Sequence, residues 1–152
     1  MKKYTISLLT LVLLLTACGQ GTPSFTVDST RPVSDANRII YQLNVGAFTP
    51  EGTFKAAEGQ LARLDTLGID ILWLMPIYPR GVTMHSPYAS MNFYDVNPAY
   101  GTVGDLKAFV AAAHEHGMKV WLDWVPNHVA VENPWVTEHP EYFTKDAKGQ
   151  TT

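Results

Sequence analysis

The sequence predicts an α/β fold with parallel strands. Short apolar runs of strand type alternate with segments of helical period, in the order strand, helix, strand, helix, strand. The connections between the strands are long enough to cross over the sheet, which makes neighbouring strands parallel. With 46% hydrophobic and 16% charged residues, the 152-residue chain can build a core. Its net charge of −3 argues against a nucleic-acid-binding protein, which normally carries a clustered basic face.

The N-terminus has the pattern of a bacterial secretory leader. Two lysines precede an apolar run over residues 6–15, which is shorter than the roughly 20 residues of a membrane span. The following Leu-Thr-Ala-Cys, residues 15–18, resembles a lipobox, in which the cysteine is lipidated after cleavage. We therefore expect a lipoprotein signal peptide over residues 1–17 and a lipid anchor at Cys18, which would hold the protein to a membrane of the bacterial cell envelope. The alternative is an ordinary signal peptide with an incidental cysteine.

The first half of the chain predicts a tether, two strands and one helix. Residues 18–37 are rich in Gly, Ser, Thr and Pro without an apolar period, which is typical of a flexible tether. Residues 39–43 form a β-branched and aromatic strand. Residues 54–67 have the i, i+4, i+7 spacing of one buried helix face. Residues 69–75 are almost continuously apolar, which indicates a strand covered on both sides.

The second half predicts one more helix and a third strand. The helix begins after Thr102, whose hydroxyl can cap it, while Asp105 takes the place of the usual Glu in a capping box. Gly117 closes the helix. The third strand covers residues 120–122, and we expect no helix after it.

Polar residues gather at one edge of the predicted sheet. Asp123, Asn127 and His128 follow the third strand at its carboxyl end, where parallel α/β proteins build their sites. The connection over residues 76–101 is far longer than the usual βα loop of about 2–6 residues, and such loops are usually functional. It follows the carboxyl end of the second strand, so the loop and the three polar residues are expected on the same edge.

These segments resemble the N-terminal part of an α-amylase-family glycoside hydrolase, family thirteen. Residues 122–129, Leu-Asp-Trp-Val-Pro-Asn-His-Val, are similar to the motif on the family's third strand, residues 86–102 to its long loop, and residues 71–77 to its second strand. The resemblance implies a (β/α)8 TIM barrel. Residues 38–129 would supply its first part, with about three parallel strands and two helices, and residues 130–152 would start the domain inserted after strand three.

The resemblance also implies roles for individual residues. Asp123 would be a buried carboxylate that supports the catalytic centre without being the nucleophile, and Asn127 a calcium ligand. His128 would hydrogen-bond the sugar in the −1 subsite, and the ring of Tyr88 would stack on the same sugar. Without the resemblance, Asn127 could equally hold a turn, and His128 and Tyr88 could be structural. The sequence departs from the family at Asn92, where an aspartate is common.

The implied activity is hydrolysis of α-linked glucans such as starch or maltooligosaccharides, with retention through a covalent glycosyl-enzyme. This chemistry needs a carboxylate nucleophile and a carboxylic acid about 5 Å apart. In the family they follow strands four and five, so we expect them beyond Thr152 and expect the 152-residue chain alone to be inactive. Two alternatives are a non-catalytic glycan-binding or scaffold protein with the same barrel, and a related α-glucosyltransferase.

Overall fold

The computed structural model describes residues 37–151, and these contain one parallel sheet. Its strands are β1 (Ile40–Leu43), β2 (Ile71–Leu74) and β3 (Lys119–Leu122), in the order β1-β2-β3. The predicted number, order and direction of the strands are therefore confirmed. The expected signal peptide, the anchor at Cys18 and the tether, apart from its last residue, lie outside the described residues.

Helices connect and flank these strands. They are α2 (Val45–Phe48), α3 (Phe54–Glu58), α4 (Leu61–Thr66), α5 (Val103–Glu115), α6 (Trp135–Glu138) and the 3₁₀ helix η2 (Pro140–Tyr142). The predicted second crossover helix is α5. In the part of the chain that the structure describes, no helix has both the length and the apolar character needed to cross a membrane.

The prediction of one helix over residues 54–67 is wrong, because the segment forms α3 and α4. The break lies at Gly59 and Gln60: the N–H groups of both donate to the carbonyl of Ala57, and α4 then begins anew at Leu61. Glycine supports a helix poorly, which makes this a natural place for the break. The apolar period continues across it, since Leu61 and Leu64 are both buried.

Two short elements were also not predicted. Helix α2 follows β1 directly and is started by Asn44, whose side-chain oxygen accepts a hydrogen bond from the N–H of Gly46. The expectation that no helix follows the third strand is wrong, because the single-turn α6 begins after Pro134 and the 3₁₀ helix η2 begins at Pro140. These turns matter because they carry aromatic residues of the candidate site.

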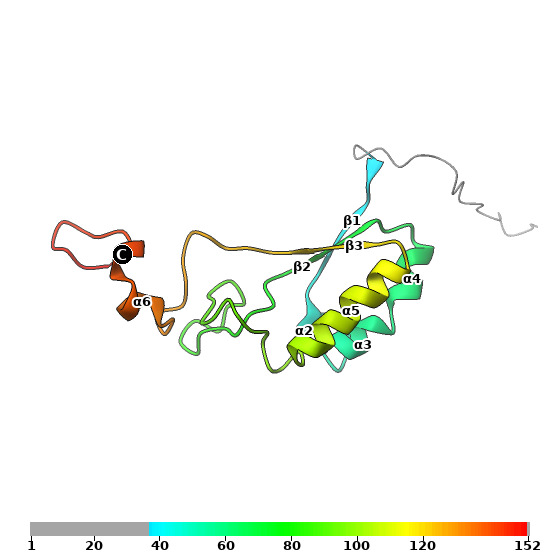
Figure 1. The fold of residues 1–152 in the computed structure, drawn as a ribbon, viewed down its shortest axis with the longest axis horizontal. Helices are drawn as coiled ribbons and strands as arrows, with labels where there is room; N and C mark the ends of the chain where they lie inside the picture. The colour runs from blue at the N-terminus through cyan, green and yellow to red at the C-terminus, as the bar shows by residue number, and fades with distance from the viewer. Residues whose placement is uncertain (1–36, 152) are drawn as a thin grey trace, which may run out of the picture. The chain divides into compact units, whose positions relative to one another are not determined.

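The helix-facing side of the sheet forms the core. Leu43, Leu72 and Leu74 point to this side and are at most 1% exposed. They pack in one cluster with fully buried helix residues, among them Phe54 of α3 and Phe109 of α5. Figure 1 shows α3, α4 and α5 together on one side of the strands. This burial fixes the sheet and therefore the edge at which the polar residues emerge.

The opposite side of the sheet is only partly covered within the described residues. Gln42, Trp73 and Trp121 lie in register on this side, and the two tryptophans are 37% and 48% exposed. Ile71 on the same side is buried. The expectation that β2 is covered on both sides is therefore wrong for Trp73 in the described part of the chain.

The predicted capping box at the start of α5 is confirmed. The hydroxyl oxygen of Thr102 accepts a hydrogen bond from the N–H of Asp105 at 3.1 Å, and the Asp105 carboxylate accepts one from the N–H of Thr102 at 2.7 Å. The Thr102 hydroxyl also donates to this carboxylate, and its hydrogen bond is the main reason why the pKa of Asp105 lies below its ordinary value. The box fixes the point at which the long loop becomes a helix.

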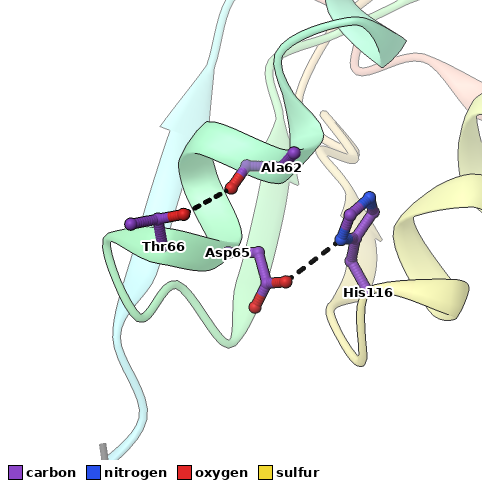
Figure 2. Close-up of polar contacts among 4 residues, drawn as sticks. All are labelled: Ala62, Asp65, Thr66 and His116. Carbon is purple, nitrogen blue, oxygen red and sulfur yellow. Dashed lines mark hydrogen bonds and ion pairs between the residues drawn. The ribbon is translucent and has the colours of Figure 1, made fainter. Parts of the chain in front are cut away.

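A polar contact ties α4 to the end of α5. Figure 2 shows the Asp65 carboxylate 3.1 Å from Nδ1 of His116, while the hydroxyl of Thr66 donates to the carbonyl of Ala62 within α4. Both members of the ion pair are partly exposed, so it contributes at most about 1 kcal/mol. The contact joins the C-terminal ends of α4 and α5, which precede the amino ends of β2 and β3, opposite the edge that carries the polar residues.

Candidate functional site

The polar edge begins with Asp123, directly after β3. Its N–H donates to the carbonyl of Leu74 at 3.0 Å, so the pairing of β2 with β3 holds its backbone in place. The Asp123 side chain is half-buried. Its negative charge acts on Tyr78, whose pKa is raised chiefly by burial and further by this charge. Asp123 and Tyr78 therefore lie near each other at the carboxyl edge of the sheet.

A cavity of about 490 Å³ opens at the same edge. Asn127 and His128 line it together with several aromatic side chains, whereas Asp123 and Tyr88 do not. Neither an Asp nor a Glu is among its lining residues in the described part of the chain. The structure thus brings two of the four predicted site residues into one cavity and places the other two outside its lining.

An aromatic wall forms one side of this cavity. Tyr78 meets Phe93 edge to face at 5.3 Å between ring centroids, and Phe93 lies 5.4 Å from Trp135. Trp135 in turn meets Tyr142 at 6.0 Å. The wall joins the long loop to α6 and η2 and offers apolar faces with polar edges, which suits a ligand that has both C–H faces and hydroxyl groups.

These four aromatic residues were missed by the sequence analysis. Trp135 and Tyr142 stand in a segment that is otherwise polar, and this contrast was the one signal that could have drawn attention to them. Their convergence with Tyr78 and Phe93 depends on contacts across more than 40 residues of sequence, which the local pattern does not contain.

His128 and Asn127 are both exposed and touch each other. The side-chain Nδ2 of Asn127 lies 3.2 Å from Nδ1 of His128. Because an amide nitrogen can only donate, Nδ1 accepts, and the proton of the neutral imidazole is then on Nε2. The pair leaves His128 with an N–H that can donate to a ligand in the cavity. It also gives Asn127 a partner other than a backbone group.

The calcium role expected for Asn127 requires further oxygen ligands. Calcium takes about six to eight oxygen ligands, and the predicted ligand Asn127 supplies one amide oxygen. Within residues 37–151, no cluster of three or more His, Cys, Asp or Glu side chains is suited to hold a metal ion. The calcium role of Asn127 stays a prediction.

Tyr88 lies in the long loop and is half-buried. Its N–H donates to the hydroxyl oxygen of Ser86 at 3.2 Å, and the next two residues, Ala89 and Ser90, are almost completely buried. The loop is anchored in the core through other residues, including Ile77, whose carbonyl accepts from the N–H of Asn97. The backbone around Tyr88 is therefore fixed although its ring does not line the cavity.

A set of hydrogen bonds fastens this loop to the chain after His128, and we call it the Ser90 clasp. The carbonyl of Ser90 accepts from the N–H of Ala130 at 3.0 Å and from Nδ2 of Asn133 at 3.1 Å. Asn133 is only 3% exposed, and its Oδ1 accepts from the N–H of Trp135 at 2.9 Å. Both functional atoms of a buried amide are thus used.

A second tie lies beside the Ser90 clasp. The carboxylate of Glu132 accepts hydrogen bonds from the N–H and from the hydroxyl of Thr83. The hydrogen bond from the Thr83 hydroxyl is the main reason why the pKa of Glu132 is lowered. This tie is exposed, whereas the clasp is buried, so the clasp is the better shielded connection between the two segments.

The fold and site define a parallel α/β protein with a polar and aromatic site at the carboxyl edge of its sheet. Residues 23–150 match the model of the alpha amylase catalytic domain, so the chain belongs to the alpha-amylase family. Its described strands and helices are the N-terminal part of a (β/α)8 barrel. The fold class implied by the resemblance is therefore confirmed.

The chain is similar to several members of this family. It is 35% identical over 125 residues to malto-oligosyltrehalose trehalohydrolase of Deinococcus radiodurans, covering 82% of this chain and 21% of that protein. It is 36% identical over 102 residues to alpha-glucosidase of Apis mellifera, covering 64% of this chain and 18% of that protein. The chain thus spans about a fifth of the length of these curated relatives.

Solved structures of alpha-amylases also match this chain. An alpha-amylase from Lactobacillus plantarum matches with a TM-score of 0.73 and 45% identity, covering 76% of this chain and 29% of that chain. An alpha-amylase from Geobacillus thermoleovorans, complexed with acarbose, matches with a TM-score of 0.62 and 31% identity, covering 72% and 28%.

Proposed function

We propose that the protein that carries this chain hydrolyses α-linked glucans such as starch or maltooligosaccharides. The observation that carries the proposal is the pair of Asn127 and His128 lining an aromatic cavity at the carboxyl edge of the sheet. Membership of the alpha-amylase family supports it. So does the name of the Geobacillus thermoleovorans relative, an alpha-amylase whose structure holds acarbose.

Each site residue has a role in this proposal. His128 donates its Nε2–H to a hydroxyl of the sugar in the −1 subsite, and Asn127 fixes the imidazole for this purpose. Tyr88 stacks on the same sugar ring. Asp123 acts as a charged support of the catalytic centre and is not the nucleophile.

The proposed reaction retains the anomeric configuration and therefore needs two carboxyl groups about 5 Å apart. No Asp or Glu lines the cavity in the described part of the chain, so the proposal requires that the nucleophile and the acid come from other residues of the protein. We accordingly expect residues 1–152, produced alone, to show no hydrolysis. A full reading frame that lacks one or both carboxylates would instead favour a non-catalytic glycan-binding protein.

The role of His128 can be tested with the variant His128→Ala of the full-length protein. Loss of one neutral hydrogen bond of about 0.5–1.5 kcal/mol to the transition state predicts a fall in kcat/KM of roughly 2- to 13-fold on maltooligosaccharides. Because His128 is exposed, Tm should hardly change. His114→Ala on the outer surface of α5 is the matched control and should leave kcat/KM unchanged. A folded His128→Ala protein with the kcat/KM of the wild type would refute the proposed role.

We also propose that the protein is anchored to the bacterial cell envelope through a lipid on Cys18. The lipobox-like residues 15–18 after a short apolar run support this location. Labelled palmitate should be incorporated into the wild-type protein and not into Cys18→Ser. Equal labelling of the two proteins would exclude the anchor.

A further inference from the structure

We infer that Asn133 is a positioning residue for the proposed hydrolysis, because it sets the place of Tyr88 relative to His128 through the Ser90 clasp. The inference rests on the proposed function and adds a residue that touches neither the substrate nor the reacting atoms in that proposal. It is carried by the hydrogen bonds of one buried amide and by their place in the sequence.

The Ser90 clasp joins the two site segments at the same sequence separation from the site residue of each segment. Ser90 stands two residues after Tyr88, and Ala130 stands two residues after His128. The N–H of Ala130 donates to the carbonyl of Ser90 at 3.0 Å, so the two backbones are joined two residues beyond each of the site residues. A shift of one segment against the other would therefore change the spacing between Tyr88 and His128.

Asn133 makes further hydrogen bonds at this junction. Its Nδ2 donates to the same Ser90 carbonyl at 3.1 Å, and its own N–H donates to the carbonyl of Ala130 at 2.9 Å. Its Oδ1 accepts from the N–H of Trp135, which belongs to the aromatic wall. The side chain of Asn133 thus joins the loop to the start of α6, and its backbone N–H adds a bond to the segment after β3.

Burial makes these bonds hard to replace. Asn133, Ser90 and Ala130 are each at most 3% exposed, so water cannot easily take the place of the amide. Removal of Nδ2 would leave the Ser90 carbonyl with one partner fewer and allow the loop to shift. A displacement of about 1 Å at a site can lower the rate by roughly 10²-fold.

The test compares alanine variants of two buried asparagines in the full-length protein. Asn133→Ala should lower kcat/KM for maltooligosaccharides by roughly 10- to 100-fold. Asn97→Ala is the matched control, since Asn97 is also buried and its side chain accepts from the N–H of Ala99 within the loop. Both variants should lower Tm, but Asn97→Ala should keep kcat/KM within about twofold of the wild type. If the two variants lose activity equally, the effect is only structural and the inference is wrong.

A double-mutant cycle with Tyr88→Ala separates positioning from general damage. If Asn133 acts by placing Tyr88, the double variant should lose little more than Tyr88→Ala alone, because there is no ring left to place. Multiplicative losses in the double variant would overturn the inference. Asn133→Ser serves if Asn133→Ala does not fold, because the shorter hydroxyl adds no charge, can still accept from the N–H of Trp135 and lacks the amide that donates to Ser90.

Failure of the inference and failure of the proposed function give different results. A wild-type protein that hydrolyses α-glucans, together with a folded Asn133→Ala or Asn133→Ser variant of unchanged kcat/KM, overturns the inference and leaves the function intact. A wild-type protein without activity on any α-glucan overturns the proposed function, and the inference falls with it.

Discussion

Gly81→Ala should destabilise the protein although the same substitution stabilises many others. A Cβ atom at this position would lie 2.7 Å from Cβ of Ala130 and 2.7 Å from a carboxylate oxygen of Glu132, both shorter than real Cβ contacts. The Glu132 side chain is only partly buried and can turn aside, with loss of its hydrogen bonds to Thr83. Ala130 cannot, because it is buried and its N–H is bonded to Ser90. The added methyl group must therefore push the loop away from the segment after His128.

The magnitude follows from two opposing effects. Overpacking of a buried contact costs about 1–3 kcal/mol, whereas replacing glycine by alanine gains about 0.4–1 kcal/mol through the unfolded chain. We expect Gly81→Ala to lower the free energy of unfolding by about 1–2 kcal/mol. Gly59→Ala is the matched control, since Gly59 has α-helical angles and its added Cβ would meet the Ala56 carbonyl oxygen at an ordinary 3.4 Å. That variant should gain about 0.4–1 kcal/mol.

Equilibrium unfolding in urea measures both variants. The midpoint concentration should fall for Gly81→Ala and rise for Gly59→Ala, with the slope m unchanged in each. A Gly81→Ala protein as stable as the wild type would mean that the loop can move away from Ala130 at no cost. In that case the close contact between these segments does not hold the loop.

The capping box predicts a pH dependence. The pKa of Asp105 is lowered in the folded protein, so its contribution to stability is complete above its unfolded pKa and is lost as the pH falls through the folded value. Thr102→Val removes the hydroxyl that is the main cause, so the stability difference between wild type and variant, measured in urea, should shrink from pH 7 to pH about 3; a constant difference would contradict this. For the calcium prediction, added Ca²⁺ should raise Tm more in the wild type than in Asn127→Ala, and equal shifts would exclude Asn127 as a ligand.

The elements that the sequence predicted well are those set by local side-chain period. All three strands and α5 follow from apolar patterns and end signals within each segment. The division of the first crossover helix was not predictable in this way, because Leu61 and Leu64 continue the apolar period of α3 while the backbone breaks at Gly59. Helix α2 was missed because four residues are too few to show a period, and Asn44 alone starts it.

The same distinction between local patterns and long-range contacts applies to the residues of the candidate site. Asn127 and His128 could be placed at the carboxyl edge because they follow a strand whose end is visible in the sequence. The aromatic wall could not be predicted, because Phe93 and Trp135 come together only when the long loop is fastened to the segment after β3. The clasp is invisible in the sequence for the same reason, since its central acceptor is the backbone carbonyl of Ser90.

The departure at Asn92 has a physical explanation in this geometry. The side-chain oxygen of Asn92 accepts from the N–H of Tyr94 at 2.8 Å, and its carbonyl accepts from the hydroxyl of Ser90 at 3.1 Å. An amide supplies the same acceptor oxygen as an aspartate, so this turn does not need the charge. Ser90 is thereby held through its hydroxyl on one side and through its carbonyl by Asn133 on the other. Both connections use neutral groups, so the loop beside Tyr88 should keep its geometry at acid pH values at which Glu132 becomes protonated and its tie to Thr83 weakens.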